Sequence, residues 1–284
     1  MTEAEQKLAG GVAVITGAGA GIGAGLARRA GALGMTVIVT DVSKERAEKV
    51  AGQIAAAGGK AEALVVDVSQ PLELDRLADH VFAAHGNVRL LVNNAGIETI
   101  GYSWEIPLDR WEATLNINIH GVVHGVRAFV PRMLASGEEG WIANLASMGA
   151  FGVMPTQTAY MMTKHAVQSF SECLYLEMEL KGAPIHVCSV LPGMLKTSIF
   201  EASAGANEPP YAAAHRAKMR EMVAAYGMDL DEGCAGIMAQ IAEGRFWIHT
   251  QPDMSMGAIE SRIDFFRSQK PPVLAEQARH LVEG

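Results

Sequence analysis

The sequence predicts an α/β fold built on a doubly wound parallel sheet of about seven strands. The chain has 284 residues, of which 49% are apolar, enough to bury a large core. Short apolar runs alternate with longer segments of helical period along most of this length. Most of these runs are continuous, which is typical of strands covered on both faces. Such alternation produces right-handed βαβ units, and therefore a parallel sheet with helices on both sides.

The individual elements follow in order along the chain. We expect strands at residues 12–16, 36–40, 61–66, 89–92, 141–145, 185–191 and 246–248. We expect helices at residues 22–33, 44–57, 72–85, 111–134, 158–180, 231–242 and 253–269. Ser43 is a suitable N-cap for the second helix, and Gly58-Gly59 provides a suitable stop.

The alternation continues without an internal repeat or a low-complexity linker. We therefore expect residues 1–284 to form a single domain. A compositional break occurs at 201–226, where Gly205, Pro209 and Pro210 interrupt an Ala-rich stretch. We interpret 197–226 as a substrate flap near the sheet edge, and 253–284 as a C-terminal extension.

Composition narrows the classes of function. The net charge is −8 without a basic cluster, which argues against nucleic acid or an anionic membrane surface as a partner. There is no apolar run of about 18 residues, so we expect no transmembrane helix. Residues 1–11 lack the pattern of a secretory leader, and the three cysteines lack CxxC spacing. These features predict a cytoplasmic protein without a structural metal.

A glycine-rich turn follows the first predicted strand and opens the first predicted helix. Its residues include Gly17, Gly19, Gly21, Ile22 and Gly23. Glycines at these positions let the backbone turn tightly and approach a pyrophosphate, whose charge then lies at the helix N-terminus. The turn predicts a dinucleotide site.

Polar residues at the ends of later strands complete the predicted cofactor site. Asp41 closes the second strand, where a carboxylate accepts both ribose hydroxyls of NAD and repels the 2′-phosphate of NADP. The alternative is a helix-capping Asp. We find no Arg or Lys in the glycine turn or next to Asp41, and Lys44 is the nearest. Further cofactor contacts are expected from Asp67, Val68, Asn94, Ala95 and Gly96.

Tyr160 and Lys164 stand four residues apart in a predicted helix, so they share one face. A free tyrosine has a pKa of about 10, which is too high for efficient proton transfer at neutral pH. A neighbouring cation favours the phenolate and lowers that pKa. The pair is therefore a candidate general acid/base.

Six motifs in order resemble the short-chain dehydrogenase/reductase family, over about residues 11–197. They are TGxxxGxG at 16–23, NNAG at 93–96, Asn118, Ser147, YxxxK at 160–164 and Pro192-Gly193. The resemblance implies a Rossmann-like fold and hydride transfer to or from a nicotinamide cofactor, with NAD as our prediction.

The resemblance also implies roles for individual residues. Tyr160 would exchange a proton with the substrate oxygen, and Ser147 would hydrogen-bond that oxygen. Lys164 would bind the nicotinamide ribose and lower the pKa of Tyr160. Asn118 would hold a water of a proton relay; we prefer it to Asn116 because Ile119-His120-Gly121 follows it.

Pro192, Gly193 and Thr197 would border the nicotinamide, with Thr197 at its carboxamide. His120 and His124 have the i, i+4 spacing of metal ligands, but no third ligand lies nearby in the sequence. We therefore predict no metal site.

The predicted pocket walls are mostly apolar, and Glu98 and Lys196 are their main charges. This composition favours a bulky hydrophobic substrate, unless several of these side chains simply pack the core. The substrate-pocket residues that we select are Ser147, Met148, Met154, Tyr160, Met194 and Phe200.

We thus expect an NAD-dependent oxidoreductase that interconverts a bulky hydrophobic or aromatic secondary alcohol and its ketone. One alternative is an NADPH-dependent carbonyl reductase, and another is a non-catalytic dinucleotide-sensing protein. The helices that carry Asn118 and Tyr160 offer a dimer face, so we predict a homodimer or a homotetramer.

Overall fold

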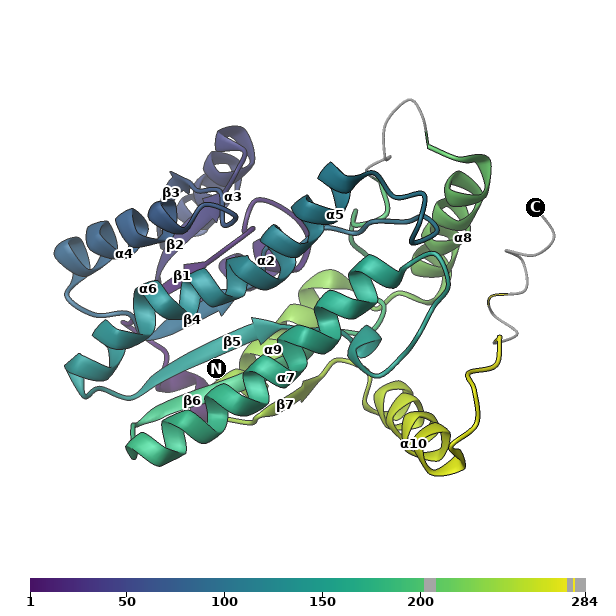
Figure 1. The fold of residues 1–284 in the computed structure, drawn as a ribbon. Coiled ribbons are helices and arrows are strands. Elements are labelled where there is room, and N and C mark those ends of the chain that lie inside the picture. Colours follow the sequence, from purple (N-terminus) through teal and green to yellow (C-terminus); the bar gives the residue numbers. More distant parts are fainter. Residues whose placement is uncertain (202–207, 275–277, 279–284) are drawn as a thin grey trace.

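The computed structural model describes residues 1–201, 208–274 and 278, so residues 202–207 of the predicted flap and most of 275–284 lie outside the described part. The described strands form one parallel sheet in the order β3-β2-β1-β4-β5-β6-β7 (Figure 1). The strands are β1 (Val12–Ile15), β2 (Thr36–Asp41), β3 (Lys60–Val65), β4 (Leu90–Asn93), β5 (Gly140–Leu145), β6 (Ile185–Leu191) and β7 (Trp247–His249).

Helices cover both faces of this sheet (Figure 1). One face carries α2 (Gly21–Ala32), α3 (Lys44–Ala56) and α9 (Leu230–Ala242). The other carries α4 (Pro71–His85), α6 (Gly121–Ser136) and α7 (Thr158–Lys181). The remaining helices are α1 (Glu3–Gln6), α5 (Leu108–Leu115), the π-helical turn η1 (Asn116–His120), the short 3₁₀ helix η2 (Met148–Ala150), α8 (Pro210–Tyr226) and α10 (Pro252–Ser268).

The central strand β1 shows how two cores form around one sheet. Ala13 and Ile15 pack in the cluster beneath α2, α3 and α9, whereas Val12 and Val14 pack in the cluster beneath α4, α6 and α7. Successive side chains of a strand point to opposite faces, so a continuous apolar run is required when both faces are covered. The expected doubly wound α/β fold is therefore confirmed.

The strand order reverses between β1 and β4. The chain moves from β1 outward to β2 and β3, then returns to place β4 on the other side of β1. Helices above the two halves diverge at such a reversal and leave a crevice at the carboxyl ends of the strands. The glycine turn follows β1 and the Asn94 segment follows β4, so both lie at this crevice.

All seven expected strands are present, with ends that differ by about a residue. The single helix expected at 111–134 instead begins at Leu108 and contains the π-helical turn η1 between α5 and α6. Within the predicted flap, we did not expect the long helix α8. Pro210 occupies the first turn of this helix. A backbone N–H in the first turn has no acceptor within the helix, so proline loses nothing by lacking one, and its fixed φ suits a helix. Proline therefore starts a helix here instead of breaking the chain.

The helix expected near the C-terminus is α10, and Ser255 is its buried residue. It stands apart from the two layers, beyond β7 (Figure 1). Among the helices of the described residues, none has the length and apolar character needed to cross a bilayer.

Candidate active site

The glycine turn between β1 and α2 leaves no room for side chains at two positions. Gly17 has a φ of 61°, and a Cβ there would lie 2.8 Å from the Cα of Ala95. A Cβ at Gly23 would overlap the side-chain amide of Asn94 and the carbonyl oxygen of Gly17. The turn is therefore a backbone surface that opens at the N-terminus of α2, which fits a pyrophosphate group.

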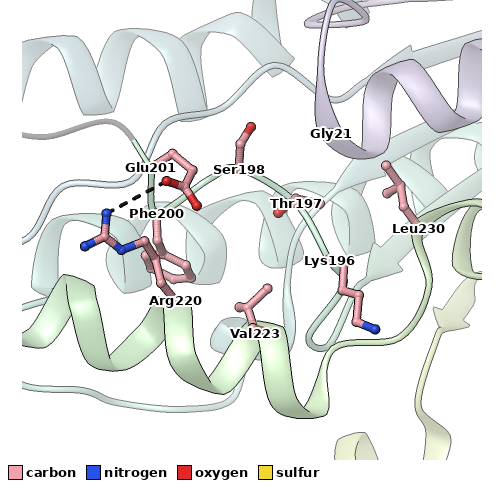
Figure 2. Close-up of a pocket in the computed structure, with 10 residues that line it drawn as sticks. Gly21, Lys196, Thr197, Ser198, Phe200, Glu201, Arg220, Val223 and Leu230 are labelled. Carbon is pink, nitrogen blue, oxygen red and sulfur yellow. Dashed lines mark ion pairs between the residues drawn. The ribbon is translucent and has the colours of Figure 1, made fainter.

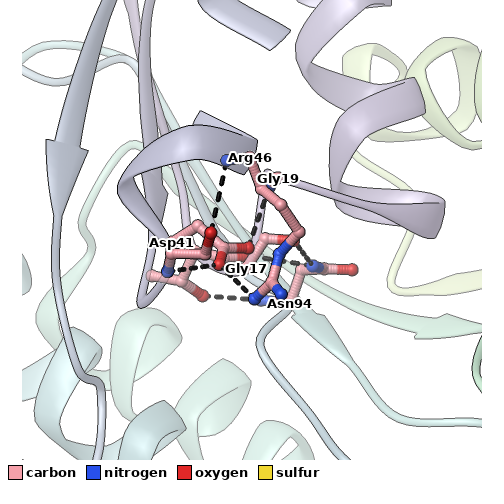
Figure 3. A network of polar contacts seen from close by, with 7 residues as sticks. Gly17, Gly19, Asp41, Arg46 and Asn94 are labelled. Atoms are coloured by element: carbon pink, nitrogen blue, oxygen red, sulfur yellow. Dashed lines mark hydrogen bonds and ion pairs between the residues drawn. The ribbon is translucent and has the colours of Figure 1, made fainter. Parts of the chain in front are cut away.

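Asn94 holds this turn from the neighbouring strand. Its Nδ2 donates to the carbonyl oxygens of Thr16 (2.8 Å) and Gly17 (3.1 Å), and its backbone N–H donates to Thr16 Oγ1 (3.0 Å) (Figure 3). These bonds link the ends of β1 and β4 across the point where the strand order reverses. Asn94 thus fixes the position of the glycine turn through these hydrogen bonds. Ala95 and Gly96 follow it directly in the chain.

Asp41 is surrounded by donors. Its carboxylate accepts hydrogen bonds from the backbone N–H groups of Gly19 (3.1 Å) and Ser43 (2.8 Å), and from Arg46 Nη2 (2.6 Å) (Figure 3). Arg46 reaches it because side chains in the first turn of a helix point back toward the N-terminus. Our statement that no cation lies next to Asp41 is therefore wrong, because the sequence distance concealed the contact.

Asp67 and Val68 follow β3, as expected, and some of their polar groups already have partners within the protein. Asp67 Oδ1 accepts from the backbone N–H of Ser69 (2.9 Å), and the Asp67 N–H donates to Glu73 Oε2 (2.7 Å). The carbonyl oxygen of Val68 contacts Nδ1 of His124 on α6 (3.0 Å). His124 therefore connects α6 to the segment after β3. Among the described residues, no group of three or more His, Cys, Asp or Glu side chains is arranged to hold a metal ion.

Ser147, Tyr160 and Lys164 come together at the carboxyl ends of the central strands. Ser147 follows β5 and caps η2, where its Oγ accepts from the Gly149 N–H (3.0 Å). The Ser147 hydroxyl lies close enough to Tyr160 to lower the pKa of its phenol. One turn farther along α7, Lys164 Nζ lies 5.5 Å from the centre of the Tyr160 ring and donates to the carbonyl oxygen of Leu145 (2.7 Å).

Asn118 lies in the π-helical turn and its side chain is buried, at 1% exposure. Its Oδ1 accepts from the Ile97 N–H (2.8 Å), and its Nδ2 donates to Ile97 O (2.9 Å) and Thr163 Oγ1 (3.1 Å). Asn116 instead contacts His120 at the surface. Asn118 therefore joins the segment after β4 to α7, and π-helical turns often occur at functional sites.

Burial controls the ionisation of the central pair. It lowers the pKa of Lys164 to about 8, against a weaker opposing effect of the Glu98 carboxylate. It also raises the pKa of Tyr160, and Glu98 raises it further, while the nearby Ser147 hydroxyl acts in the opposite direction. The net shift of the Tyr160 pKa is therefore upward and not downward as we expected, because desolvation of the phenolate dominates. The lowering effect expected from Lys164 stays a prediction.

The loop after β6 carries Pro192, Gly193 and Thr197, and the segment after β7 holds it. The Gly193 N–H donates to Thr250 Oγ1 (3.0 Å), and the Met194 N–H donates to Gln251 Oε1 (2.9 Å). Sequence reasoning missed Thr250 and Gln251. Two polar side chains directly after a buried strand were the available signal, because they lie at the edge where the site residues gather.

A cavity of about 560 Å³ opens between this loop and α8 (Figure 2). Arg220 and Glu201 form an ion pair at it (3.8 Å), so this part of the lining is more charged than we expected. Of the selected substrate-pocket residues, Phe200 lies in the lining. The lining comprises Gly21, Lys196, Thr197, Ser198, Phe200, Glu201, Arg220, Val223, Ala224 and Leu230.

Comparison with known proteins adds to this geometry. The sequence model described as short chain dehydrogenase matches residues 11–208. A solved structure of a short chain dehydrogenase/reductase from Burkholderia phymatum in complex with NAD has a TM-score of 0.90 and 30% sequence identity. The match covers 95% of this chain and 98% of that chain.

Two curated relatives differ in how much of their length the chain spans. The 1-deoxy-11-beta-hydroxypentalenate dehydrogenase of Streptomyces avermitilis is 31% identical over 85% of this chain and 84% of its own length. The probable oxidoreductase EphD of Mycobacterium tuberculosis is 35% identical over 69% of this chain. That match spans about a third (32%) of EphD.

Proposed function

The chain belongs to the short chain dehydrogenase family, and from this premise we propose that it oxidises a bulky hydrophobic secondary alcohol with NAD, or reduces the corresponding ketone. The observation that carries the proposal is the grouping of Ser147 and Tyr160 beside buried Lys164 at the carboxyl ends of the central strands. These three groups supply what carbonyl–alcohol exchange needs: a proton donor or acceptor, a second hydrogen bond to the oxygen, and a nearby positive charge.

The residues at the crevice fit a dinucleotide. The glycine turn would hold the pyrophosphate at the N-terminus of α2, and Asp41 would accept the hydroxyls of the adenosine ribose. Thr197 lies close to Gly21, with its Cβ 3.7 Å from where a Gly21 Cβ would stand, so the loop after β6 would close over the nicotinamide half. The preference for NAD over NADP rests on Asp41, whose carboxylate would repel a 2′-phosphate.

When bound, the nicotinamide ring donates or accepts the hydride. The chain's own residues manage the proton. In the oxidation, Tyr160 would take the proton from the substrate hydroxyl while Ser147 holds that oxygen. Lys164, whose pKa is lowered to about 8, would favour the phenolate when it is charged. Asn118 would keep the Gly96–Ile97 segment against this group through its bonds to Ile97.

An apolar substrate is supported by Phe200 and Val223 at the cavity. A relative named for a dehydrogenase of a hydroxypentalenate is consistent with a bulky alcohol. An NADPH-dependent carbonyl reductase remains the alternative reaction, and Arg46 beside Asp41 is the observation that favours it, since a guanidinium binds phosphate well.

The test uses initial rates on cyclic and aryl secondary alcohols with NAD and with NADP, for the wild type and Tyr160→Phe. We expect turnover with NAD, and a loss of about 10²–10⁴-fold in kcat in the variant, because the proton-transfer group is gone. Titration of NAD into both proteins is the control, and its binding should persist. Undiminished turnover in Tyr160→Phe would disprove the mechanism, whereas NAD binding without turnover in the wild type would favour a dinucleotide sensor.

A further inference from the structure

Glu98 is a buried acid that the proposed chemistry does not use. It lies two residues beyond Gly96, and its side chain is 7% exposed. Among the described residues, neither carboxyl oxygen finds a hydrogen-bond partner of normal geometry. The side chain of Gln157 and the backbone N–H of Thr99 lie near enough to favour its charged form, but not to satisfy both oxygens. A buried acid in this state is unusual.

The backbone around Glu98 is fixed. Asn118 binds both the N–H and the carbonyl oxygen of Ile97, and the Gly101 N–H donates to the carbonyl oxygen of Thr156 (2.8 Å). Thr156 directly precedes Gln157, the N-cap residue of the helix that carries Tyr160. The carboxyl group is therefore held beside the helix that carries Tyr160.

Its electrostatic surroundings join the reaction centre to α8. The charges of Lys164 and Arg216 both act on Glu98, and Glu98 in turn acts on Tyr160. Arg216 donates from Nε (2.9 Å) and Nη2 (2.6 Å) to Glu208, which supplies a partner for its charge other than Glu98. Burial is the dominant influence and raises the pKa of Glu98 to about 8. At neutral pH the group is mostly a neutral acid, with one O–H donor and free acceptor capacity.

Glu98 is not among the residues that line the cavity, but helix α8 connects the segment that carries it to that cavity. Arg216 and Arg220 are one turn apart on α8, and Arg220 lines the cavity. Tyr211, at the start of α8, accepts from the N–H of Tyr102 (3.0 Å), a few residues after Glu98. The same helix thus covers both the cavity and the segment that carries Glu98.

We propose that Glu98 is a substrate-recognition residue that hydrogen-bonds a second hydroxyl group on the otherwise apolar substrate, which makes the preferred substrate class a cyclic diol or similar hydroxylated alcohol. This inference rests on the proposed function. A site built to bind a hydroxyl group discriminates strongly against an analogue without it, because the buried polar group is then left without a partner.

The test compares cyclohexanol with the 1,2-, 1,3- and 1,4-cyclohexanediols, each as separate stereoisomers, by kcat/KM in the presence of NAD. For the wild type, we expect at least one diol to be preferred over cyclohexanol by about tenfold or more, the size of one buried hydrogen bond. Glu98→Leu has no hydrogen-bonding group, and its ratio should fall to near one. Glu98→Gln retains a donor and an acceptor, so it should keep most of the preference.

The ratio of kcat/KM for a diol to kcat/KM for cyclohexanol is measured within each variant. A lower fraction of folded enzyme reduces both values equally and therefore does not change the ratio. The inference is overturned if the wild type prefers no diol, or if Glu98→Leu leaves the ratio unchanged. If cyclohexanol is still turned over in either of these two outcomes, the proposed alcohol dehydrogenase reaction holds even though the inference about Glu98 fails. If the wild type oxidises neither class with NAD or NADP while it still binds the cofactor, the proposed function itself fails.

Discussion

The cofactor end and the substrate end of this molecule are built in different ways. At the cofactor end, backbone segments pack closely together. Gly17 and Gly23 leave no space for a Cβ, and Asn94, which follows β4, hydrogen-bonds the glycine turn that follows β1. At the substrate end, long side chains from α8 and the loop after β6 line the cavity. We expect cofactor binding at the first end to depend on positions where only glycine fits. We expect selectivity at the second end to depend on the side chains that line the cavity.

The sharpest way to break this comparison is to add one methyl group at the cofactor end. Gly23→Ala places a Cβ against the Asn94 side chain and the Gly17 carbonyl oxygen. We expect NAD affinity to fall about tenfold or more, because overpacking of this kind costs about 1–3 kcal/mol. Isothermal titration with NAD measures the change.

Gly52→Ala is the matched control, since Gly52 lies within α3 and a Cβ there meets nothing within 4 Å. That variant should bind NAD normally and gain up to about 1 kcal/mol in the free energy of unfolding. Equal effects from both substitutions would show that the turn is less tightly packed than the geometry indicates.

A second prediction concerns the loop after β6, which lies between the cofactor end and the substrate end and is held by Gln251. Gln251→Ala removes the acceptor for the Met194 N–H and a donor to the Met194 carbonyl oxygen. We expect the free energy of unfolding to fall by about 1–3 kcal/mol, the range for leaving a buried backbone group without a partner. Urea denaturation measures this change.

Gln251→Glu retains an acceptor for the Met194 N–H and should recover part of the stability. If Gln251→Ala unfolds at the same urea concentration as the wild type, the segment after β7 does not hold the loop.

A third prediction concerns the dependence of stability on pH. The pKa of Glu98 is raised from 4.5 to about 8 in the folded protein, so between these pH values the folded state binds more protons than the unfolded state. Its contribution to stability is therefore fully present below about pH 4.5 and is lost as the pH rises through about 8. Glu98→Gln cannot titrate. Its stability relative to the wild type should rise steadily between pH 5 and pH 8 in urea denaturation at each pH, and a constant difference would contradict the shifted pKa.

Most of the cofactor end could be predicted from the sequence. Continuous apolar runs predicted the seven strands, and the glycine spacing predicted the turn at α2, because both are local patterns with one structural solution. Asn118 was preferred to Asn116, and the structure buries the former while the latter stays at the surface. The assigned catalytic roles and the homo-oligomer stay predictions.

The substrate end was harder to predict for physical reasons. Helix α8 was missed because Pro209 and Pro210 were treated as breakers, although Pro210 stands in a helical first turn. Arg46 and Gln251 act through contacts that only the folded chain creates. Apolar side chains near the predicted pocket have other roles: Leu195 is buried in the core, and Trp104 is 80% exposed and stacks against Tyr102. The apolar character of such side chains does not show whether they pack the core or line a pocket.

The bonds from Thr250 and Gln251 to the loop after β6 have a consequence for biosynthesis. This loop would border the nicotinamide, yet its supports come from residues translated after the last strand of the sheet. During synthesis, the glycine turn and Asp41 emerge early, and the other half of the crevice gains its supports only after β7 has been translated. Tight cofactor binding would therefore distinguish chains that contain β7 from shorter nascent ones, and NAD would selectively protect molecules in which β7 has already joined the sheet.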